Sequence, residues 1–464
     1  MATPPHVRAE LAPLDEDLRA AWVPDPLGDA DANARIDLVH HNGWPTLSRG
    51  VEHIRVPKPD GTALLAPVLS VPWLVAMCLA VDPIKDQVDA ALSPSVCGYR
   101  RGAEPGRSYG EEHRRFSEMV AAEADNCEYV VTADVCRFFA STSWEIVLRA
   151  AERIATADTI KPLLELVDHF QTAGVHYLPA GYADARFLAN LVLIHADRSI
   201  QLPFARWVDD YRIFASTREE AAAAVQRLHE TLCHQGLALN HSKVSVVPSS
   251  EFVRTARGSF TSVYHPETEP KNLVRAGLRS VFLEAAVDPI NRRRELRFAL
   301  PRLAGEKDNV AVDWGLKALP TIPWEAPRLI AYLVAFGGER RVRQGIESQL
   351  LSALKDNDTW LACRLAAAVC TTGLRVTAQA EVMRAMSKTD SAALWGLLLR
   401  ALALSGLASV VVEIRHRVLD ERAAAAALID LGIEVPEGLT TLVEATMRAL
   451  DGQPAPAPNV DTIL

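Results

Sequence analysis

The most informative stretch of this chain for its fold is FARWVDDYRIFA, residues 204–215. Phe204–Val208 and Tyr211–Ala215 are short runs rich in aromatic and branched residues, which favour β-strands. Asp209 and Asp210 separate these runs, and aspartate is common in tight turns. The stretch therefore predicts a β-hairpin that carries two adjacent carboxylates at its turn.

The segments around this hairpin predict an α+β domain. Tyr129–Val135 (YVVTADV) is a β-rich run that contains a third aspartate, Asp134. Residues 184–199 (DARFLANLVLIHADRS) are continuous enough in apolar residues for a buried helix. Thr142–Glu145 and Thr217–Glu220 have the spacing of a capping box, which marks a helix N-terminus. We expect the order strand, helix, helix, hairpin, helix, strand.

Asp134 and the pair Asp209 and Asp210 are suited to phosphoryl transfer. Displacement at phosphorus is helped by two divalent ions about 4 Å apart, which stabilise the attacking and leaving oxygens. Magnesium prefers hard oxygen ligands such as carboxylates. One acid at the end of a strand, facing two acids on a neighbouring turn, supplies such ligands. We predict that the three aspartates are catalytic and bind Mg²⁺ or Mn²⁺.

Four motifs that follow one another in the chain resemble those of reverse transcriptases. DVCRFF (134–139) resembles the first catalytic motif, and LPAGYADARFLAN (178–190) resembles the substrate-positioning motif. WVDDYRIF (207–214) resembles the catalytic hairpin, and GLALNHSK (236–243) resembles the motif that ends on a lysine. The resemblance covers about residues 50 to 250 and implies the fingers and palm of a polymerase that makes DNA.

The resemblance also implies roles in nucleotide binding. Phe139 would be the steric gate whose ring excludes a 2′-hydroxyl and so selects deoxynucleotides. Gly181 would let the backbone approach the base pair closely. Lys243 would lie near the triphosphate or donate a proton. The basic residues expected to hold the triphosphate are Arg100, Arg55 and Lys58.

The chain departs from the usual pattern at particular positions. Ala66 stands where the fingers strand normally has an arginine, and Ala180 replaces the glutamine of the substrate-positioning motif. No primer-grip motif follows Lys243. The pattern is most similar to the abortive-infection and defence-associated reverse transcriptases of bacteria, which implies a role in antiviral defence. RNA-templated and template-independent synthesis both stay open.

Composition divides the chain into four parts. Residues 1–49 form a lead-in rich in proline, aspartate and alanine, and residues 50–265 form the fingers and palm. Residues 275–450 are rich in alanine and leucine and predict an all-α, HEAT-like helical-repeat domain. Residues 451–464 are predicted to form a flexible tail. The fold class we expect is therefore α+β, with a reverse-transcriptase domain followed by this helical domain.

The net charge of −9 is unusual for a protein that binds nucleic acid. Local basic clusters must then supply the phosphate contacts. The contacts that we expect in the helical domain are Arg292, Arg293, Arg294 and Arg297. The expected partners are dNTPs and RNA or DNA, including a noncoding RNA. The helical domain offers a surface for a second copy of the chain or a partner protein.

Composition and hydropathy bear on where the protein works. Apolar residues make up 49% of the chain and charged residues 23%, as in ordinary globular proteins. No apolar run is long enough for a membrane span, and acids interrupt the first residues where a signal peptide would be apolar. We expect a cytoplasmic protein with no membrane partner.

Two hypotheses of different classes follow from the sequence. The first is an active polymerase with Asp134, Asp209 and Asp210 at its centre. The second is a catalytically inactive nucleic-acid-binding or scaffold protein that acts through its helical repeats. Three clustered carboxylates repel one another, and a protein without catalysis has no physical need for them. The sequence therefore favours the enzyme.

Overall fold

The computed structural model places most of the chain from Gly50 to His416. The residues that it describes are 50–69, 71–101, 109–261, 271–372, 374–416, Val23, 423–424, 427–428 and Leu431. The expected lead-in, apart from Val23, and the expected tail lie outside them. The mixture of strands with many helices confirms the α+β class.

A five-stranded sheet, in the spatial order β3-β5-β6-β4-β7, forms the centre of the region predicted to be the palm, which is called the palm below. Its strands are β3 (Val96–Cys97), β4 (Tyr129–Asp134), β5 (Phe204–Trp207), β6 (Asp210–Ala215) and β7 (Ser245–Pro248). All neighbours are antiparallel except β3 and β5. β5 and β6 form the predicted hairpin, which is confirmed. Asp134 lies opposite Asp210 in the pairing of β4 with β6.

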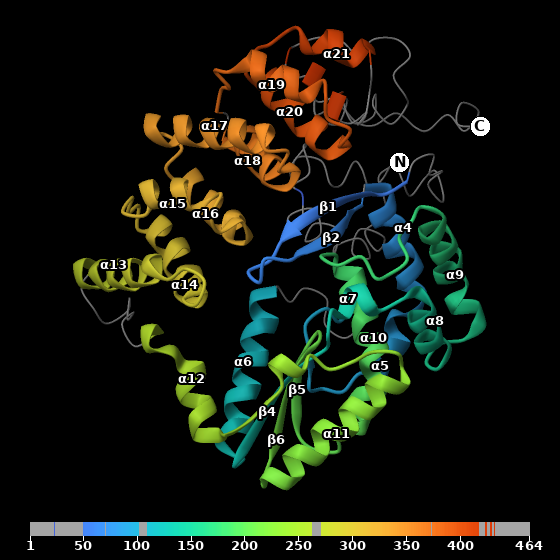
Figure 1. The fold of residues 1–464 in the computed structure, drawn as a ribbon. Coiled ribbons are helices and arrows are strands. Elements are labelled where there is room, and N and C mark those ends of the chain that lie inside the picture. The colour runs from blue at the N-terminus through green and yellow to red at the C-terminus, as the bar shows by residue number, and fades with distance from the viewer. Residues whose placement is uncertain are drawn as a thin grey trace.

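Helices cover both faces of this sheet (Figure 1). α6 and α12 contact the sheet from one side and α11 from the other. The helices described in this region are α4 (Val71–Val81), α5 (Lys85–Ala91), α6 (Tyr109–Asp125), α7 (Phe138–Ser141), α8 (Trp144–Glu152), α9 (Ala157–Thr172), α10 (Ala183–Ser199), α11 (Arg218–His234) and α12 (Ser249–Thr261), with the 3-10 turns η2 (Asp82–Ile84) and η3 (His241–Lys243). Val130 and Phe214 pack toward α6, whereas Val131 and Ile213 belong to the core that contains α10 and α11. This alternation follows from the two-residue period of a strand.

Helix α10 is buried along most of its length, so the prediction of a buried helix at residues 184–199 is confirmed. Of the two predicted capping boxes, the second is confirmed, because the Thr217 hydroxyl accepts a hydrogen bond from the amide of Glu220 at 3.1 Å. The first is wrong, because Ser143 is the N-cap of α8 and makes no side-chain cap bond. The Thr142 hydroxyl instead donates to the carbonyl of Phe138 at 2.8 Å and so closes α7.

The described part of residues 271–416 is helical, as predicted. Its elements are α13 (Lys271–Val287), α14 (Arg293–Gly305), α15 (Val312–Ala318), η4 (Pro323–Glu325), α16 (Ala326–Val334), α17 (Arg340–Lys355), α18 (Thr359–Thr372), α19 (Gln379–Met386), α20 (Ala392–Leu404) and α21 (Val410–His416). Helices α14, α16, α18 and α20 contact one another in succession, and α15, α17 and α19 form a second row. The rows curve around the upper left of the palm (Figure 1).

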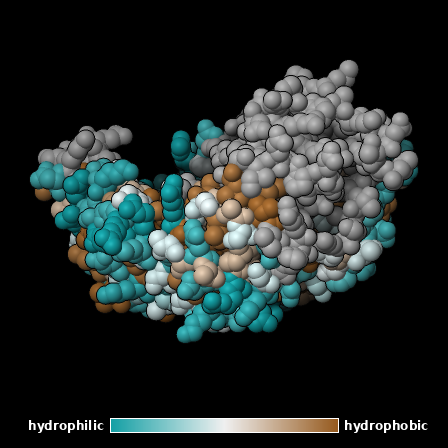
Figure 2. Space-filling model, turned by 90° about the horizontal axis from the view of Figure 1, so that it is seen from above, coloured by the Kyte–Doolittle hydropathy of each residue, from teal (hydrophilic) through white to brown (hydrophobic). Residues whose placement is uncertain are grey.

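Hydropathy on the upper face of the molecule is uneven. Viewed from above, hydrophilic residues cover its left part and hydrophobic residues gather near its middle (Figure 2). Among the helices that the structure describes, none is long and apolar enough to cross a membrane.

A two-stranded hairpin, β1 (Glu52–Pro57) and β2 (Ala63–Val68), joins the palm region to the helical domain. Its side chains Ile54, Val56 and Ala66 are buried in the core of the helical domain and not in that of the palm. The hairpin precedes the palm in the chain, yet its apolar face packs on helices that follow the palm.

A polar contact supports the same packing. The Glu52 carboxylate accepts a hydrogen bond of 3.2 Å from the amide of Ala393, at the start of α20. The first amides of a helix have no acceptor within the helix, and Glu52 accepts a hydrogen bond from one of them. Its negative charge is also favourable at the positive end of the helix dipole. The hairpin is thereby held by the helical domain through apolar and polar contacts.

Candidate active site

The strand register brings the three predicted catalytic aspartates together. Asp134 is the last residue of β4 and Asp210 is the first of β6, and they are paired partners in adjacent strands. Paired residues of antiparallel strands have Cα atoms about 4.5 to 5.5 Å apart. Asp209 lies in the turn directly before Asp210. The adjoining ends of β4 and β6, with the turn before β6, thus carry three carboxylates.

The surroundings of Asp209 disfavour its charged form. Burial raises the pKa of Asp209 to about 7, and the neighbouring charges of Asp134 and Asp210 contribute to the rise. Lys243 acts in the opposite direction. Like charges in a partly buried site disfavour ionisation, so a bound cation would favour the charged form of Asp209.

Lys243 supplies one positive charge to this site. Its ammonium group lies 3.0 Å from Oδ1 of Asp134. Burial opposes the charged form of Lys243, but the bond to Asp134 and the other two aspartates outweigh it, so its pKa is raised. The sequence predicted Lys243 near the triphosphate or as a proton donor, and the structure places it on a predicted metal ligand.

Asn240 is a further member of the site that sequence reasoning missed. Its backbone amide donates to the carbonyl oxygen of Asp134 at 2.7 Å, and its side-chain amide donates to Oδ2 of Asp134 at 3.3 Å. These bonds fix Asp134 relative to η3, which begins directly after Asn240. The sequence signal was the Asn-x-x-Lys spacing, which puts both groups on one short turn.

The donor set fits a hard divalent cation. Carboxylate oxygens are the ligands that magnesium and manganese prefer. In the part of the chain covered by the structure, no three acidic, histidine or cysteine side chains lie close enough to enclose a metal ion. Both carboxylate oxygens of Asp134 instead accept hydrogen bonds, from Lys243 and Asn240. Protein donors thus satisfy the ligand atoms of Asp134 in this structure.

Phe139 lies close to the aspartates in the chain, in the first turn of α7. It is partly buried, and its ring packs edge to face against Phe138 with centroids 5.6 Å apart. Phe138 is 2% exposed and is therefore a core residue, which leaves Phe139 as the candidate gate.

Gly181 adopts a φ of +102° directly before α10, in a conformation that side chains rarely tolerate. The next residue, Tyr182, ties this loop to strand β2. Its hydroxyl donates to the carbonyl of Pro67 at 3.0 Å and accepts from the amide of Leu69 at 2.9 Å. The loop that carries Gly181 is thus fixed to the hairpin that carries Arg55 and Lys58.

The basic residues predicted to hold the triphosphate differ in their surroundings. The guanidinium of Arg100 donates to the carbonyls of Asp89 and Ser93 at 2.9 and 3.0 Å, and so binds the C-terminal end of α5. Arg55 and Lys58 are exposed on the β1–β2 hairpin. A triphosphate role for these three residues stays a prediction.

The arginine cluster of the helical domain is largely engaged in ion pairs. Arg292 pairs with Glu284 at 2.7 Å. Arg293 and Arg297 pair with Glu325 at 3.0 and 2.8 Å, and Glu325 is 1% exposed. The fourth predicted contact, Arg294, is exposed. Binding of nucleic acid by this cluster stays a prediction, and much of its charge is balanced within the domain.

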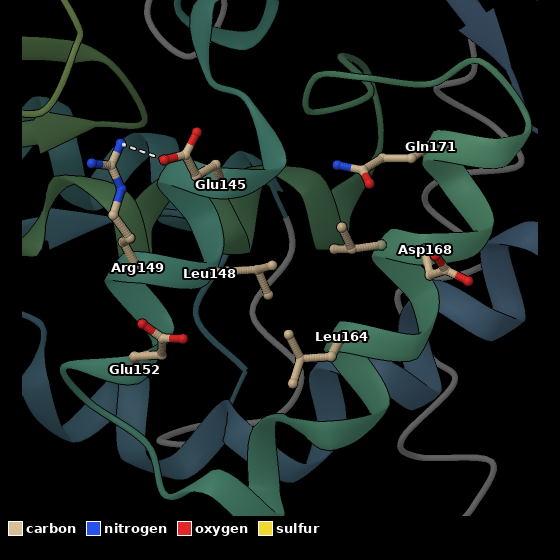
Figure 3. Close-up of a pocket in the computed structure, with 8 residues that line it drawn as sticks. Glu145, Leu148, Arg149, Glu152, Leu164, Asp168 and Gln171 are labelled. Atoms are coloured by element: carbon tan, nitrogen blue, oxygen red, sulfur yellow. Dashed lines mark ion pairs between the residues drawn. The ribbon is translucent and has the colours of Figure 1, made fainter.

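A groove of about 560 Å³ lies between α8 and α9 (Figure 3). Its lining residues are Glu145, Leu148, Arg149, Glu152, Leu164, Val167, Asp168 and Gln171. Three carboxylates and one arginine make it acidic, and Glu145 pairs with that arginine at 3.9 Å. None of the predicted site residues lines it. An acidic groove repels phosphates, so it is not the substrate site.

Comparison with known proteins identifies the class of the palm region. Residues 79–256 match the family model of the reverse transcriptase (RNA-dependent DNA polymerase). A search of curated proteins gave no match. The matched segment contains the three aspartates, Phe139, Gly181 and Lys243. The chain thus carries a reverse-transcriptase domain. This similarity supports a nucleic-acid polymerase of the reverse-transcriptase type and implies nucleotides and nucleic acid as substrates.

The raised pKa of Asp209 predicts how stability depends on pH without metal. The group ionises near pH 4 in the unfolded chain and at about 7 in the folded protein. Its contribution to folding stability is therefore lost as pH rises through this window. The measurement is the unfolding temperature in the presence of a chelator. Between about pH 5 and about pH 8, this temperature is expected to fall more for wild type than for Asp209→Asn.

The matched control for this measurement is Asp158→Asn, the same change at an exposed position of α9. It is expected to follow wild type at both pH values. Equal losses in wild type and Asp209→Asn would contradict the electrostatic account of the turn.

Proposed function

We propose that this protein is an active polymerase that makes DNA from dNTPs by two-metal catalysis, with Asp134, Asp209 and Asp210 as catalytic residues. The observation that carries the proposal is the strand pairing that sets Asp134 opposite Asp210, with Asp209 directly before it in the turn. Burial, with a contribution from the charges of Asp134 and Asp210, raises the pKa of Asp209 to about 7. Folding gains nothing from such an arrangement, whereas binding of divalent cations uses it directly.

The three aspartates would hold the ions, either Mg²⁺ or Mn²⁺. When bound, these ions stabilise the attacking and leaving oxygens of the transferred phosphate. Lys243 balances the charge of Asp134 before catalysis and holds an ammonium proton within the site. Asn240 keeps Asp134 oriented through its two hydrogen bonds.

Selection of deoxynucleotides is assigned to Phe139, five residues after Asp134. A ring beneath the sugar leaves no room for a 2′-hydroxyl. Gly181 permits close approach of the backbone to the nucleotide. Both proposals rest on the motif pattern and on the half-buried ring and the positive φ at these positions.

The alanine at position 66 changes how the triphosphate is held. Ala66 is fully buried in the helical-domain core, so an arginine there would place a charge among apolar side chains. Arg55 lies on the opposite, exposed face of the same hairpin, and Lys58 is exposed at its end. We propose that these two residues, with Arg100, bind the triphosphate.

The wider role is proposed from the motif pattern. It favours a defence-associated reverse transcriptase of bacteria, working in the cytoplasm, with RNA or DNA and a noncoding RNA among its partners. The two stacked rows of helices support a HEAT-like domain that serves as a surface for a second copy or a partner protein. Arg292, Arg293, Arg294 and Arg297 are its proposed phosphate contacts.

The proposal is tested by incorporation of each labelled dNTP into product by the full-length protein, with Mg²⁺ or Mn²⁺. Parallel reactions contain added RNA, nuclease-treated protein or chelator. Synthesis that needs the metal establishes the polymerase, and its dependence on RNA distinguishes templated from template-independent synthesis. No synthesis in any reaction would favour the inactive scaffold.

A further inference from the structure

The turn that carries Asp209 is backbone-strained. It consists of Val208 and Asp209, between the ends of β5 and β6. Val208 has a φ of +55°, whereas Asp209 is not among the residues with positive φ. Positive φ at only the first turn residue is typical of a type II′ turn, where glycine is favoured. A β-branched residue is costly in this conformation, so surrounding contacts must hold it.

Arg206 donates a hydrogen bond to the backbone of this turn. Its Nη1 donates to the carbonyl of Val208 at 2.6 Å and to the side-chain oxygen of Asn190 at 2.8 Å. The Arg206 side chain is fully buried, with an exposed fraction of 0%. A buried bond from a charged donor is among the stronger hydrogen bonds in proteins.

Arg206 is itself fixed from helix α10. Its Nε and Nη2 bind both carboxylate oxygens of Asp197 at 2.8 and 2.7 Å. Tyr211 also donates to Asp197, at 2.9 Å. Burial opposes the charge of Arg206, yet Asp197 outweighs this effect and the pKa of Arg206 is raised. The guanidinium therefore has a single orientation, defined by four hydrogen bonds to three residues.

Stability does not explain this arrangement. A buried ion pair is usually no better for folding than well-packed apolar residues of similar volume, because both charges lose their hydration. The pair does, however, fix geometry. Because the guanidinium is planar and its Nε and Nη2 are bound to Asp197, the direction in which Nη1 donates is also fixed. Here Nη1 donates to the carbonyl of Val208, in the strained turn.

We propose that Arg206 is a positioning residue for Asp209, which holds the catalytic turn in its strained conformation through the carbonyl of Val208. Asp197 and Asn190 orient Arg206, so helix α10, which begins directly after the Gly181 loop, determines where Asp209 lies. This proposal rests on the proposed function, because it assigns Asp209 a catalytic task.

The test compares Arg206→Lys with wild type in the full-length protein. A lysine keeps the positive charge beside Asp197 but cannot bind both its oxygens and reach Val208 with the same geometry. We expect kcat for dNTP incorporation to fall roughly 10- to 100-fold, while KM for dNTP changes less than about threefold. The metal concentration for half-maximal rate is expected to rise in the same variant.

A matched control separates positioning from general destabilisation. Tyr332 is buried in the helical domain, where its hydroxyl donates to the carbonyl of Asp308 at 2.6 Å. Tyr332→Phe removes a buried hydrogen bond far along the chain from the turn and is expected to keep the wild-type kcat. If Arg206→Lys does not fold, the double variant Arg206→Met and Asp197→Leu removes both buried charges and takes its place.

Hydrogen exchange supplies a readout that does not need activity. Peptides that cover residues 204–213 are expected to exchange faster in the Arg206 variant, with peptides of the helical domain unchanged. Wild-type kcat and wild-type exchange in this segment would overturn the proposal. If wild type itself makes no DNA, the proposed function fails, and exchange at the turn still decides whether Arg206 holds it.

Discussion

Asp209→Asn is expected to lower dNTP incorporation by about 1,000-fold or more, because it removes a charged ligand from the centre of a metal-dependent site. The asparagine has nearly the same shape, so the turn and its hydrogen bonds are kept. The structure also predicts that the change relieves repulsion with Asp134 and Asp210. Loss of activity should therefore occur without loss of folding, as measured by primer-extension or product-labelling rates beside thermal unfolding.

Two comparisons make this result decisive. Asp158→Asn, the same substitution on the exposed side of α9, is expected to keep the wild-type rate. Added Mg²⁺ or Mn²⁺ is expected to raise the unfolding temperature of wild type more than that of Asp209→Asn, because ligands stabilise the state that binds them. Synthesis by Asp209→Asn at a rate similar to wild type would exclude the assigned catalytic role.

Phe139→Ala is expected to raise the use of ribonucleotides relative to deoxynucleotides by roughly 10- to 100-fold, the range that steric selection in a pocket can supply. The reason is that removal of the ring opens space beneath the sugar. The measurement is the ratio of kcat/KM for each ribonucleotide to that for the matching deoxynucleotide.

The adjacent phenylalanine provides the control for this prediction. Phe138 is buried in the palm core beside Phe139, so Phe138→Leu is expected to reduce stability and leave the sugar preference unchanged. An unaltered ratio in Phe139→Ala, or an equal shift in both variants, would reject the gate.

Local patterns predicted the hairpin that carries Asp209 and Asp210 well. The β5–β6 hairpin and strand β4 follow from runs of aromatic and branched residues that end at aspartates, and pairing of their ends brings these acids together. Helix α10 follows equally from its apolar length. In each case the information lies within a few residues of the element concerned.

Contacts between distant segments could not be predicted in this way. In the sequence, Arg206 looks like an ordinary polar residue of a strand. The local pattern does not reveal that its guanidinium binds Asp197 and the carbonyl of Val208. Arg100 was predicted to hold the triphosphate, but its guanidinium meets the backbone carbonyls of Asp89 in α5 and of Ser93 just after it. Lys243 was predicted to lie near the triphosphate or to donate a proton, and only the fold shows its contact with Asp134.

The packing of the β1–β2 hairpin has a consequence for synthesis of the chain on the ribosome. Ile54, Val56 and Ala66 leave the ribosome early, but the helices that cover them are translated some 300 residues later, as the contact of Glu52 with Ala393 illustrates. Until the helical domain has been translated, the apolar face of the hairpin stays exposed. Partly folded chains that expose apolar surface are the kind that chaperones bind. A chain truncated after the palm would keep that face uncovered permanently, and we expect it to aggregate before it can serve as a minimal enzyme.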